Sequence, residues 1–295
     1  MTNNSNIVNI IKSATTENRP VRIATHDGVF HADEVFAVAA IADACKYMGA
    51  TYQLYRTRNE SVLSACDIRV DVGGKFHPET GDFDHHHDIT LPASCTLVWD
   101  DLCGSVFVRQ TLLDPISSLD CNFSEYTKKY PIGPYKTVGQ AIMDFYDSNH
   151  PNGSFDEAVK FARLVLRNSV RKAEEREAHL KTIADGKNIG EFAASYDAAI
   201  PYNEFRAKLD RPIIVFPDPV SGHCVVSLDT DKFNFANIDT TLWPELLFTH
   251  KAGFFTKWQT KEAAVEFAEA KSEWRSQEID QWAIEHNEGR GARQQ

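Results

Sequence analysis

The chain has 295 residues, 42% hydrophobic and 25% charged, which is typical of a globular protein with one or two sizeable cores. Lys and Arg number 31 against 42 Asp and Glu, so the net charge of −11 excludes a generally basic nucleic-acid binder but leaves a local basic groove open. Six cysteines without a Cys-x-x-Cys pair favour reduced thiols over disulfides or a zinc finger. No apolar run suits a membrane helix and residues 1–20 resemble no targeting signal, so we expect no membrane association and a cytoplasmic location, with an organelle left open.

Strands alternate with helices in the first half of the chain. Residues 21–25, 52–56 and 68–72 are predicted to be strands, because they are short β-branched or aromatic runs. A helix is predicted over 33–47, with Asp33 as a candidate N-cap and Gly49 as its stop. Further predictions are a helical turn at 61–65, a hairpin turn over 76–83, and helices at about 96–113, 138–149 and 154–185. The alternation predicts an α/β fold with a mainly parallel sheet flanked by helices.

The second half changes character after the long helical pattern. Residues 213–216 and 223–228 form a predicted strand pair, and another is expected within 247–258. A last helix is predicted from Thr260 through Trp282, and the tail after His286 is expected to fray. We therefore predict an N-terminal catalytic domain over 1–150, a connector helix over 151–190 and a smaller α+β domain over 191–295.

Histidine and aspartate gather in three clusters within the first 90 residues. The clusters are residues 26–33 between a predicted strand and helix, residues 70–74 at the end of a strand, and residues 84–88 after the hairpin turn. In an open α/β sheet, ligands bind where strands end and helices begin. The three clusters could therefore meet at one edge of the sheet.

Each cluster also has an ordinary structural explanation. Asp33 alone suits an N-cap, Asp71 suits a turn after a strand, and a single His is usually a surface or core residue. The joint pattern favours a metal site, and imidazole with carboxylate but no thiolate favours Mn²⁺, Fe²⁺, Co²⁺ or Mg²⁺ over structural zinc. Two such ions with a bridging carboxylate suit phosphoester hydrolysis. The chain has no Gly-x-Ser-x-Gly and no P-loop, which disfavours serine catalysis and a P-loop nucleotidase.

Several blocks of the sequence resemble the melanocyte-proliferating-gene family, a branch of the DHH phosphoesterase superfamily. The blocks are Thr25–Glu34, Arg56–Arg58, Val70–Gly74 and Phe83–His86, and a weaker late block covers Phe248–Phe255. The resemblance implies a DHH-type N-terminal domain. Animal and fungal members are associated with 3′–5′ RNA exonuclease activity, and older descriptions call them metal-dependent protein hydrolases. Protein hydrolysis fits this chain poorly, since it has no His-Glu-x-x-His pattern.

The resemblance also implies roles for individual residues. Two divalent ions, with Mn²⁺ preferred over Mg²⁺, would be held by six residues, of which Asp71 bridges the ions: His26, His31, Asp33, Asp71, His85 and Asp120. Asp114 is the alternative to Asp120. His86 would contact the scissile phosphate, and Asp84 would orient a ligating imidazole, so that His86, Asp71 and Asp84 form the expected catalytic set.

Substrate contacts are predicted on both halves of the chain. The resemblance covers Arg58 and His250, which are expected to bind phosphate. Arg167 belongs to a basic stripe on the predicted connector helix, and Lys251 lies in the late block with aromatic neighbours that include Trp258. Such a stripe is usually a solvated face, and the aromatic residues could be core. A cleft between the domains would be the substrate site.

The leading prediction is a metal-dependent 3′–5′ RNA exonuclease that releases nucleoside monophosphates by two-metal hydrolysis. Its partners would be single-stranded RNA or short oligonucleotides, and a homodimer is a further expectation. One alternative is a small-substrate phosphoesterase that cleaves short oligonucleotides, cyclic dinucleotides or phosphoanhydrides. Another is a non-catalytic metal-binding scaffold. The dependence of cleavage on substrate length would separate the first two.

Overall fold

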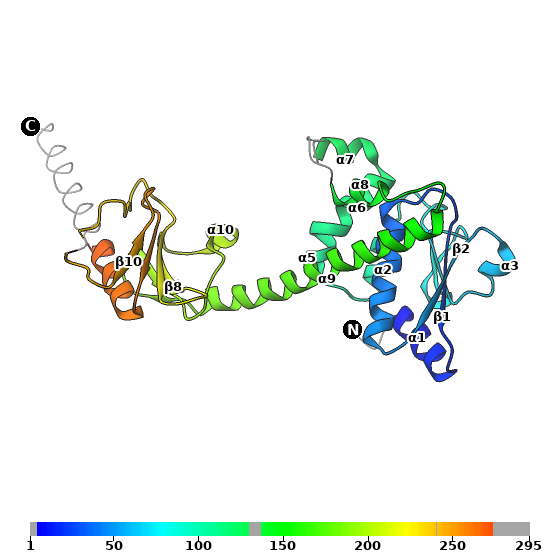
Figure 1. The fold of residues 1–295 in the computed structure, drawn as a ribbon, viewed down its shortest axis with the longest axis horizontal. Coiled ribbons are helices and arrows are strands. Elements are labelled where there is room, and N and C mark those ends of the chain that lie inside the picture. The colour runs from blue at the N-terminus through cyan, green and yellow to red at the C-terminus, as the bar shows by residue number, and fades with distance from the viewer. Residues whose placement is uncertain (1–4, 130–136, 240, 274–295) are drawn as a thin grey trace, which may run out of the picture. The chain divides into compact units, whose positions relative to one another are not determined.

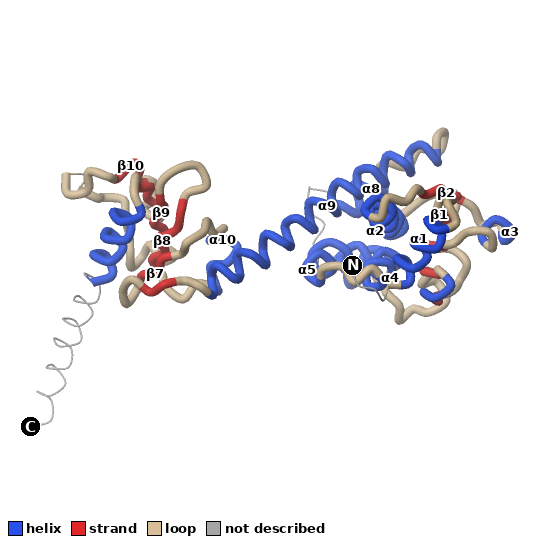
Figure 2. Tube along the Cα trace, turned by 90° about the horizontal axis from the view of Figure 1, so that it is seen from below, coloured by secondary structure: helices blue, strands red, loops and turns tan. Residues whose placement is uncertain are grey.

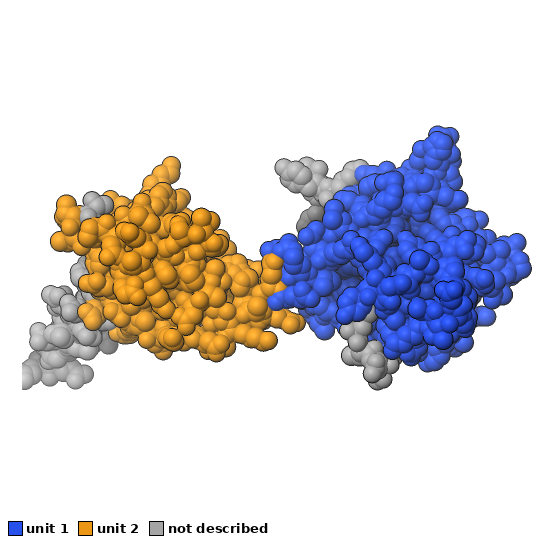
Figure 3. All heavy atoms as spheres, turned by 60° about the horizontal axis from the view of Figure 1, so that its bottom comes forward, with its two compact units in different colours: residues 1–174 blue, residues 175–295 orange. Residues whose placement is uncertain are grey.

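The computed structural model describes residues 5–129, 137–239 and 241–273. The chain divides into two compact units, residues 1–174 and 175–295, which Figure 3 colours separately. The division falls within the long helix α9, Pro151–Ala184, which lies inside the predicted connector segment (Figure 1). Within the described ranges, no helix combines the length and apolar character needed to cross a bilayer.

A five-stranded sheet with the order β2-β1-β3-β5-β4 organises the first unit. Strand β1 pairs in parallel with β2 and β3, β3 pairs in parallel with β5, and β4 is antiparallel to β5. The predicted α/β architecture with a mainly parallel sheet is thus confirmed, as is the predicted hairpin. The strands are β1 Val21–Thr25, β2 Tyr52–Arg56, β3 Ile68–Val70, β4 Phe76–His77 and β5 Asp82–Phe83.

Helices surround this sheet, as Figure 2 shows. They are α1 Asn6–Thr16, α2 Ala32–Tyr47, α3 Glu60–Leu63, α4 Ser94–Asp101, α5 Val106–Val108, α6 Asp114–Cys121, α7 Phe123–Lys129 and α8 Val138–Met143, with short turns η1 Pro78–Thr80 and η2 Arg109–Leu113. Helix α2 is apolar almost all round and is buried between the sheet and α4, α6 and α8. Ile23 packs into this core, whereas its neighbour Ala24 packs with Leu63 of α3, because successive strand residues face opposite sides.

Several helix boundaries differ from the sequence predictions. The N-cap of α2 is His31, so Asp33 lies inside the first turn and the N-cap prediction for it is wrong. The predicted helix over 96–113 is interrupted after Asp101, where Cys103 adopts a left-handed φ of 52°. The predicted helix over 138–149 ends at Met143. Helix α1 was not predicted, although Ser5 caps it and its apolar residues follow helical spacing.

The second unit contains a six-stranded, mainly antiparallel sheet with the order β10-β11-β9-β8-β7-β6. Its strands are β6 Lys187–Asn188, β7 Ala193–Ser195, β8 Ile213–Pro217, β9 His223–Ser227, β10 Leu246–Thr249 and β11 Phe255–Trp258, with α10 Tyr202–Phe205 and η3 Arg206–Lys208. Both predicted strand pairs are confirmed as antiparallel. The short strands β6 and β7 were missed, because two or three residues give no periodic signal.

Each face of the second sheet covers its own core. Ile213, Val215 and Val225 face a helix over residues 261–273, which contributes Phe267. Ile214 and Val226 face the opposite side with the end of α9. The predicted terminal helix therefore begins where expected, while its continuation to Trp282 and the tail after His286 lie outside the described residues.

Candidate metal centre

The three sequence clusters come together at the carboxyl edge of the first sheet. Strand β1 is followed by His26, β3 by Asp71, and β5 by Asp84 and His85, while the start of α2 supplies Asp33. Because β1, β3 and β5 run parallel, their carboxyl ends lie at the same edge. The sheet topology thus explains how residues up to 59 positions apart meet, as the span from His26 to His85 shows.

Asp33 and Glu34 are the most deeply buried carboxylates of the centre. Both side chains are 0% exposed, and both lie in the first turn of α2. Neither oxygen of Asp33 receives a hydrogen bond, and Glu34 Oε2 has none either. A buried carboxylate without a donor is unfavourable unless it pairs with a cation. These buried carboxylate oxygens, which have no hydrogen-bond donor, are therefore the strongest structural indication of a cation-binding site.

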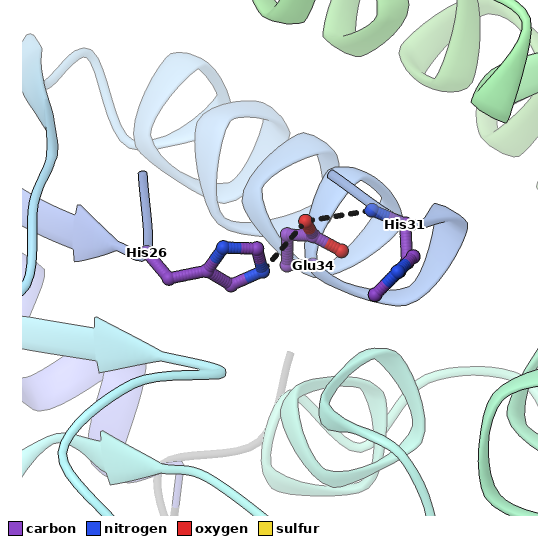
Figure 4. A group of neighbouring side chains, drawn as sticks. All are labelled: His26, His31 and Glu34. Carbon is purple, nitrogen blue, oxygen red and sulfur yellow. Dashed lines mark hydrogen bonds and ion pairs between the residues drawn. The ribbon is translucent and has the colours of Figure 1, made fainter. Parts of the chain in front are cut away.

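Glu34 links the two histidines of the first cluster. Its Oε1 accepts a hydrogen bond of 2.8 Å from the backbone N–H of His31 and lies 3.1 Å from His26 Nε2, as Figure 4 shows. His26 is buried, and its Nε2 also lies 3.4 Å from Asp71 Oδ2. Glu34 was not predicted as a site residue. Its position three residues after the N-cap is typical of a residue that caps a helix. The sequence therefore gives no sign of its contact with His26.

Asp71 occupies the middle of the cluster. Its Oδ1 accepts a hydrogen bond of 3.0 Å from Ser94 Oγ and lies 3.2 Å from His85 Nε2. Its φ of 56° is in the left-handed region, which non-glycine residues rarely adopt and which is concentrated at functional sites. The Asp71 carboxylate therefore contacts imidazoles from two of the predicted clusters, a position that suits a bridging role.

The third cluster contributes two imidazoles with different environments. His85 is buried, and its Nε2 faces Asp71. The His86 side chain is 62% exposed, and its Nδ1 lies 2.7 Å from Asp84 Oδ1. Asp84 is itself buried and accepts a second hydrogen bond of 2.6 Å from the Gly74 N–H. The orienting contact of Asp84 is therefore to His86.

Helix α6 adds the sixth predicted ligand. Asp120 Oδ2 lies 3.3 Å from His85 Nε2, and Asp120 Oδ1 lies 3.8 Å from His31 Nδ1. The alternative, Asp114, lies at the other end of α6 and pairs with Arg109 at 3.4 Å. The structure therefore brings Asp120, and not Asp114, to the cluster.

The electrostatics show how strongly these groups interact. Burial disfavours a charged His26, but Asp71 and Glu34 outweigh it and raise the pKa of His26 to about 10. Burial and then the charge of Asp71 raise the pKa of the Asp33 carboxyl well above its usual value. Burial opposes ionisation of Asp71 as well, yet contacts with His26 and His85 lower its pKa overall. Burial and mutual contacts thus shift the pKa values of all three groups.

The donor set fits a divalent cation. Two groups of three residues share Asp33, and in each group one donor atom of every residue lies within 4.8 Å of the other two. The first group is His31, Asp33 and Asp120. The second is Asp33, Glu34 and Asp71. A third triad joins Asp71 to His85 and His86. Mixed oxygen and imidazole donors suit divalent metals of the Mn²⁺ and Mg²⁺ type.

A pocket of about 520 Å³ opens beside the cluster. Imidazoles of His26, His31 and His86 line it together with Arg58, and Val29, Leu63 and Val72 supply apolar surface. The Arg58 guanidinium lines this pocket but is ion-paired with Asp27. The carboxylates of Glu60, Asp71 and Asp84 also line the pocket, which therefore combines basic, acidic and apolar groups and includes candidate metal ligands in its wall.

The remaining predicted substrate residues are not among those that line this pocket. Arg167 binds the Asp43 carboxylate through Nε and Nη2 at 2.5 to 3.1 Å. His250 and Lys251 belong to the second unit, where His250 Nδ1 accepts a hydrogen bond of 3.1 Å from the Ala252 N–H and Lys251 is exposed. Trp258, expected near the substrate, is fully buried in the core. It therefore cannot stack on a base.

Comparison with known proteins agrees with the sequence motifs. Residues 22–99 match the profile of the MYG1 exonuclease family, described as an uncharacterised protein family (UPF0160). The predicted resemblance is confirmed for this segment. A MYG1 protein of Schizosaccharomyces pombe is 49% identical over 162 residues, which is 50% of this chain and 48% of the relative. A MYG1 protein of Chlamydia trachomatis is 30% identical over 147 residues, 43% of this chain and 50% of the relative.

The mouse MYG1 exonuclease is 45% identical over 67 residues, 23% of this chain and 17% of that protein. The three alignments thus cover half or less of each relative's length. Among solved structures, an exonuclease RecJ bound to manganese has a TM-score of 0.30 at 12% identity, over 92% of this chain and 93% of that one. RecJ of Thermus thermophilus with Mn²⁺ has a TM-score of 0.29 at 13% identity, over 92% and 54%. At these scores the structural likeness supports no conclusion about the site.

Proposed function

We propose that this protein is a divalent-metal-dependent phosphodiesterase. The observation that supports the proposal most strongly is the fully buried Asp33 carboxylate, which receives no hydrogen bond and stands beside Asp71 and Glu34. Such a group needs a cation, and His26, His85 and Asp120 surround the same space with further donors. The similarity to proteins named MYG1 exonuclease supports phosphodiester bonds as the substrate class.

The finer proposal is a 3′–5′ exonuclease that acts on single-stranded RNA and releases nucleoside monophosphates. Two divalent ions bridged by Asp71 would be held by His26, His31, Asp33, His85 and Asp120. When bound, such ions acidify water and neutralise charge on phosphoryl oxygens. We propose Mn²⁺ over Mg²⁺ because three of the six ligands are imidazoles, which suit Mn²⁺ better than the harder Mg²⁺.

The residues of the chain itself prepare the substrate. The Asp84 carboxylate accepts a hydrogen bond from His86 Nδ1–H. In the imidazolium form of His86, Nε2–H would donate to a phosphoryl oxygen of the substrate. Because Asp84 is buried and also held by the Gly74 N–H, it fixes the orientation of the exposed His86 ring. Arg58 at the rim of the pocket would exchange its pairing with Asp27 for a phosphate.

A small-substrate phosphoesterase is the second candidate. The pocket beside the cluster, about 520 Å³, is within the range of small-ligand sites, and the net charge of −11 does not favour a long polyanion. An enzyme of this kind would cleave dinucleotides or phosphoanhydrides and leave long RNA intact.

One assay separates these functions. The purified chain is incubated with Mn²⁺, Mg²⁺ or chelator and with 5′-end-labelled RNA, single-stranded DNA or dinucleotides. We expect a ladder that shortens from the 3′ end of RNA and requires the divalent ion. Cleavage of dinucleotides alone would support the second candidate. Tight Mn²⁺ binding without cleavage of any substrate would support a scaffold and contradict the proposal.

Two substitutions on helix α6 provide a matched comparison in this assay. Asp120→Asn should reduce cleavage by at least about 100-fold, because it removes a carboxylate that contacts His85 and His31. Asp114→Asn changes the same residue type on the same helix, outside the cluster, and should retain activity near the wild-type level. Equal activity of the two variants would refute the role assigned to Asp120.

A further inference from the structure

A thiol lies directly behind one of the proposed metal ligands. Cys121 is the last residue of α6, and its side chain is exposed. Its Sγ lies 3.6 Å from His85 Nδ1 and 4.0 Å from Asp120 Oδ2. Cys121 belongs to none of the three histidine and aspartate clusters, and it has no role in the proposed phosphodiesterase chemistry.

His85 connects this thiol to the centre. Its Nε2 lies 3.2 Å from Asp71 Oδ1 and 3.3 Å from Asp120 Oδ2, but neither contact has hydrogen-bond geometry. The residue is about nine-tenths buried. His85 Nε2, which has no hydrogen-bond partner, therefore faces the carboxylates of Asp71 and Asp120. His85 Nδ1 faces the Cys121 thiol. A buried nitrogen that lacks a partner and faces carboxylates indicates a place where a cation can bind.

One donor atom from each of His85, Asp120 and Cys121 lies within 4.8 Å of the other two. This set has one nitrogen, one oxygen and one sulfur, and sulfur favours thiophilic cations such as Zn²⁺ and Cd²⁺ over Mn²⁺ or Mg²⁺. The other candidate triads among the described residues contain only nitrogen and oxygen donors.

We propose that His85, Asp120 and Cys121 form a thiophilic cation site that overlaps the metal centre and inhibits it. This inference rests on the proposed function, because inhibition follows from sharing His85 and Asp120 with the catalytic ions. On binding, the Cys121 S–H bond breaks, its proton goes to solvent, and the thiolate electron pair forms the bond to the cation. No electron transfer and no co-reactant are needed.

Cadmium binding to the full chain tests the site without reference to catalysis. Cd²⁺ alone is titrated into the metal-free protein, and the ultraviolet absorption of the cadmium–thiolate bond is recorded. We expect a saturable band for the wild type and its loss in Cys121→Ser. Cys103→Ser is the matched control, because Cys103 is also exposed but contacts the Asp101 carbonyl at 3.7 Å. It should keep the band.

Inhibition is tested separately in Mn²⁺-supported cleavage. Zn²⁺ should inhibit the wild type and Cys103→Ser at similar concentrations, whereas Cys121→Ser should need about tenfold more Zn²⁺. If the band and the inhibition are the same in Cys121→Ser as in the wild type, the thiophilic site is refuted while the phosphodiesterase stands. If the wild type shows the band but no phosphodiester is cleaved, the cation site is supported and the proposed function fails.

Discussion

Asp33 is the residue on which the account depends most. Its carboxylate is fully buried, and neither oxygen has a hydrogen-bond donor among the described residues. In the absence of a cation, burial and the charges of Asp71 and Glu34 raise its pKa well above the usual value, so ionised Asp33 opposes folding at neutral pH. Ionised Asp33 therefore destabilises the metal-free protein. We expect it to stabilise the metal-bound protein, because its charge then pairs with the cation.

Asp33→Asn should therefore have opposite effects on stability and on metal binding. Without metal, the free energy of unfolding should rise by about 1–3 kcal/mol, because the amide has no charge to repel Asp71 and can donate to it. With saturating Mn²⁺, the stabilisation seen in the wild type should be lost. Urea unfolding with chelator and with Mn²⁺ measures both effects. A variant that is less stable without metal and still stabilised by Mn²⁺ would contradict this reading of Asp33.

The individual site residues could be predicted only where a motif marked them. His26, Asp71 and His85 follow strands, so the sheet topology alone brings them to one edge. Glu34 was missed because one carboxylate performs two tasks, accepting from the His31 N–H and contacting His26, and sequence spacing reveals only the first. Cys121 was missed because its contact with His85 depends on how α6 packs, which no local pattern encodes.

At the scale of elements, Arg56 holds the first metal-binding loop in place. It lies at the end of β2 and donates to the carbonyls of Gly28 at 2.7 Å and Pro151 at 3.0 Å. Its guanidinium lies 4.6 Å from the ring centroid of Phe155, which belongs to α9. The side chain thus joins β2, the loop between His26 and His31, and the start of α9.

Arg56→Lys should disturb this junction. A lysine keeps the charge but cannot make both hydrogen bonds and stack on the ring, so we expect a loss of about 1–3 kcal/mol in the free energy of unfolding. Mn²⁺ affinity should fall as well, because the Gly28 carbonyl loses its anchor. Arg22→Lys on the exposed side of β1 is the control and should change little. Urea unfolding and Mn²⁺ titration of both variants test this; unchanged stability of Arg56→Lys would argue against the anchoring role.

The turn between β8 and β9 gives a pH-dependent prediction for the second unit. Asp218 Oδ1 accepts hydrogen bonds from Ser221 N–H at 3.0 Å and Val220 N–H at 2.9 Å and lies 3.1 Å from Lys257 Nζ. These contacts lower the pKa of Asp218 to about 2 from a usual value of 3.8. A lowered folded-state pKa means that the stabilisation is complete above pH 3.8 and is lost as the pH falls through about 2.

Asp218→Asn should therefore destabilise the protein by about 1 kcal/mol at pH 7, a figure kept small because the group is near the surface. The difference from the wild type should shrink as the pH approaches 2. Denaturant unfolding of both proteins across this pH range provides the measurement. A difference that stays constant or grows on acidification would show that the carboxylate charge is not the cause.

Secondary structure could be predicted where the apolar residues repeat over a long segment, and the prediction failed where the segment is short. Helix α9 and the β8–β9 pair follow clear patterns and were expected. The prediction of one continuous helix over 96–113 was wrong. Helix α4 ends at Asp101 and Cys103 is left-handed, although the helical spacing of apolar residues continues in the sequence. Strand β7 forms by pairing with the edge of β8, and β6 in turn pairs with β7.

At the scale of the whole molecule, the metal centre and part of the predicted substrate surface belong to different compact units. All six predicted metal ligands lie within residues 1–174, whereas His250 and Lys251 lie within residues 175–295. The cores of the two units are formed by different residues. The substrate cleft between the domains and the homodimer stay predictions.

A fragment containing residues 1–174 should bind Mn²⁺ with an affinity within about threefold of the full chain, because it keeps every proposed ligand and its own core. A fragment containing residues 175–295 should bind none at that affinity. Calorimetric titration of each fragment compares them. A large loss of affinity in the first fragment would show that the second unit contributes to the centre.

The most direct measurement is the anomalous diffraction of crystals grown with Mn²⁺. The account predicts anomalous peaks within about 2.0–2.3 Å of carboxylate oxygens of Asp33 and Asp71 and of imidazole nitrogens in the same cluster. Fully occupied crystals in which manganese binds elsewhere and leaves the Asp33 carboxylate without a cation would contradict it.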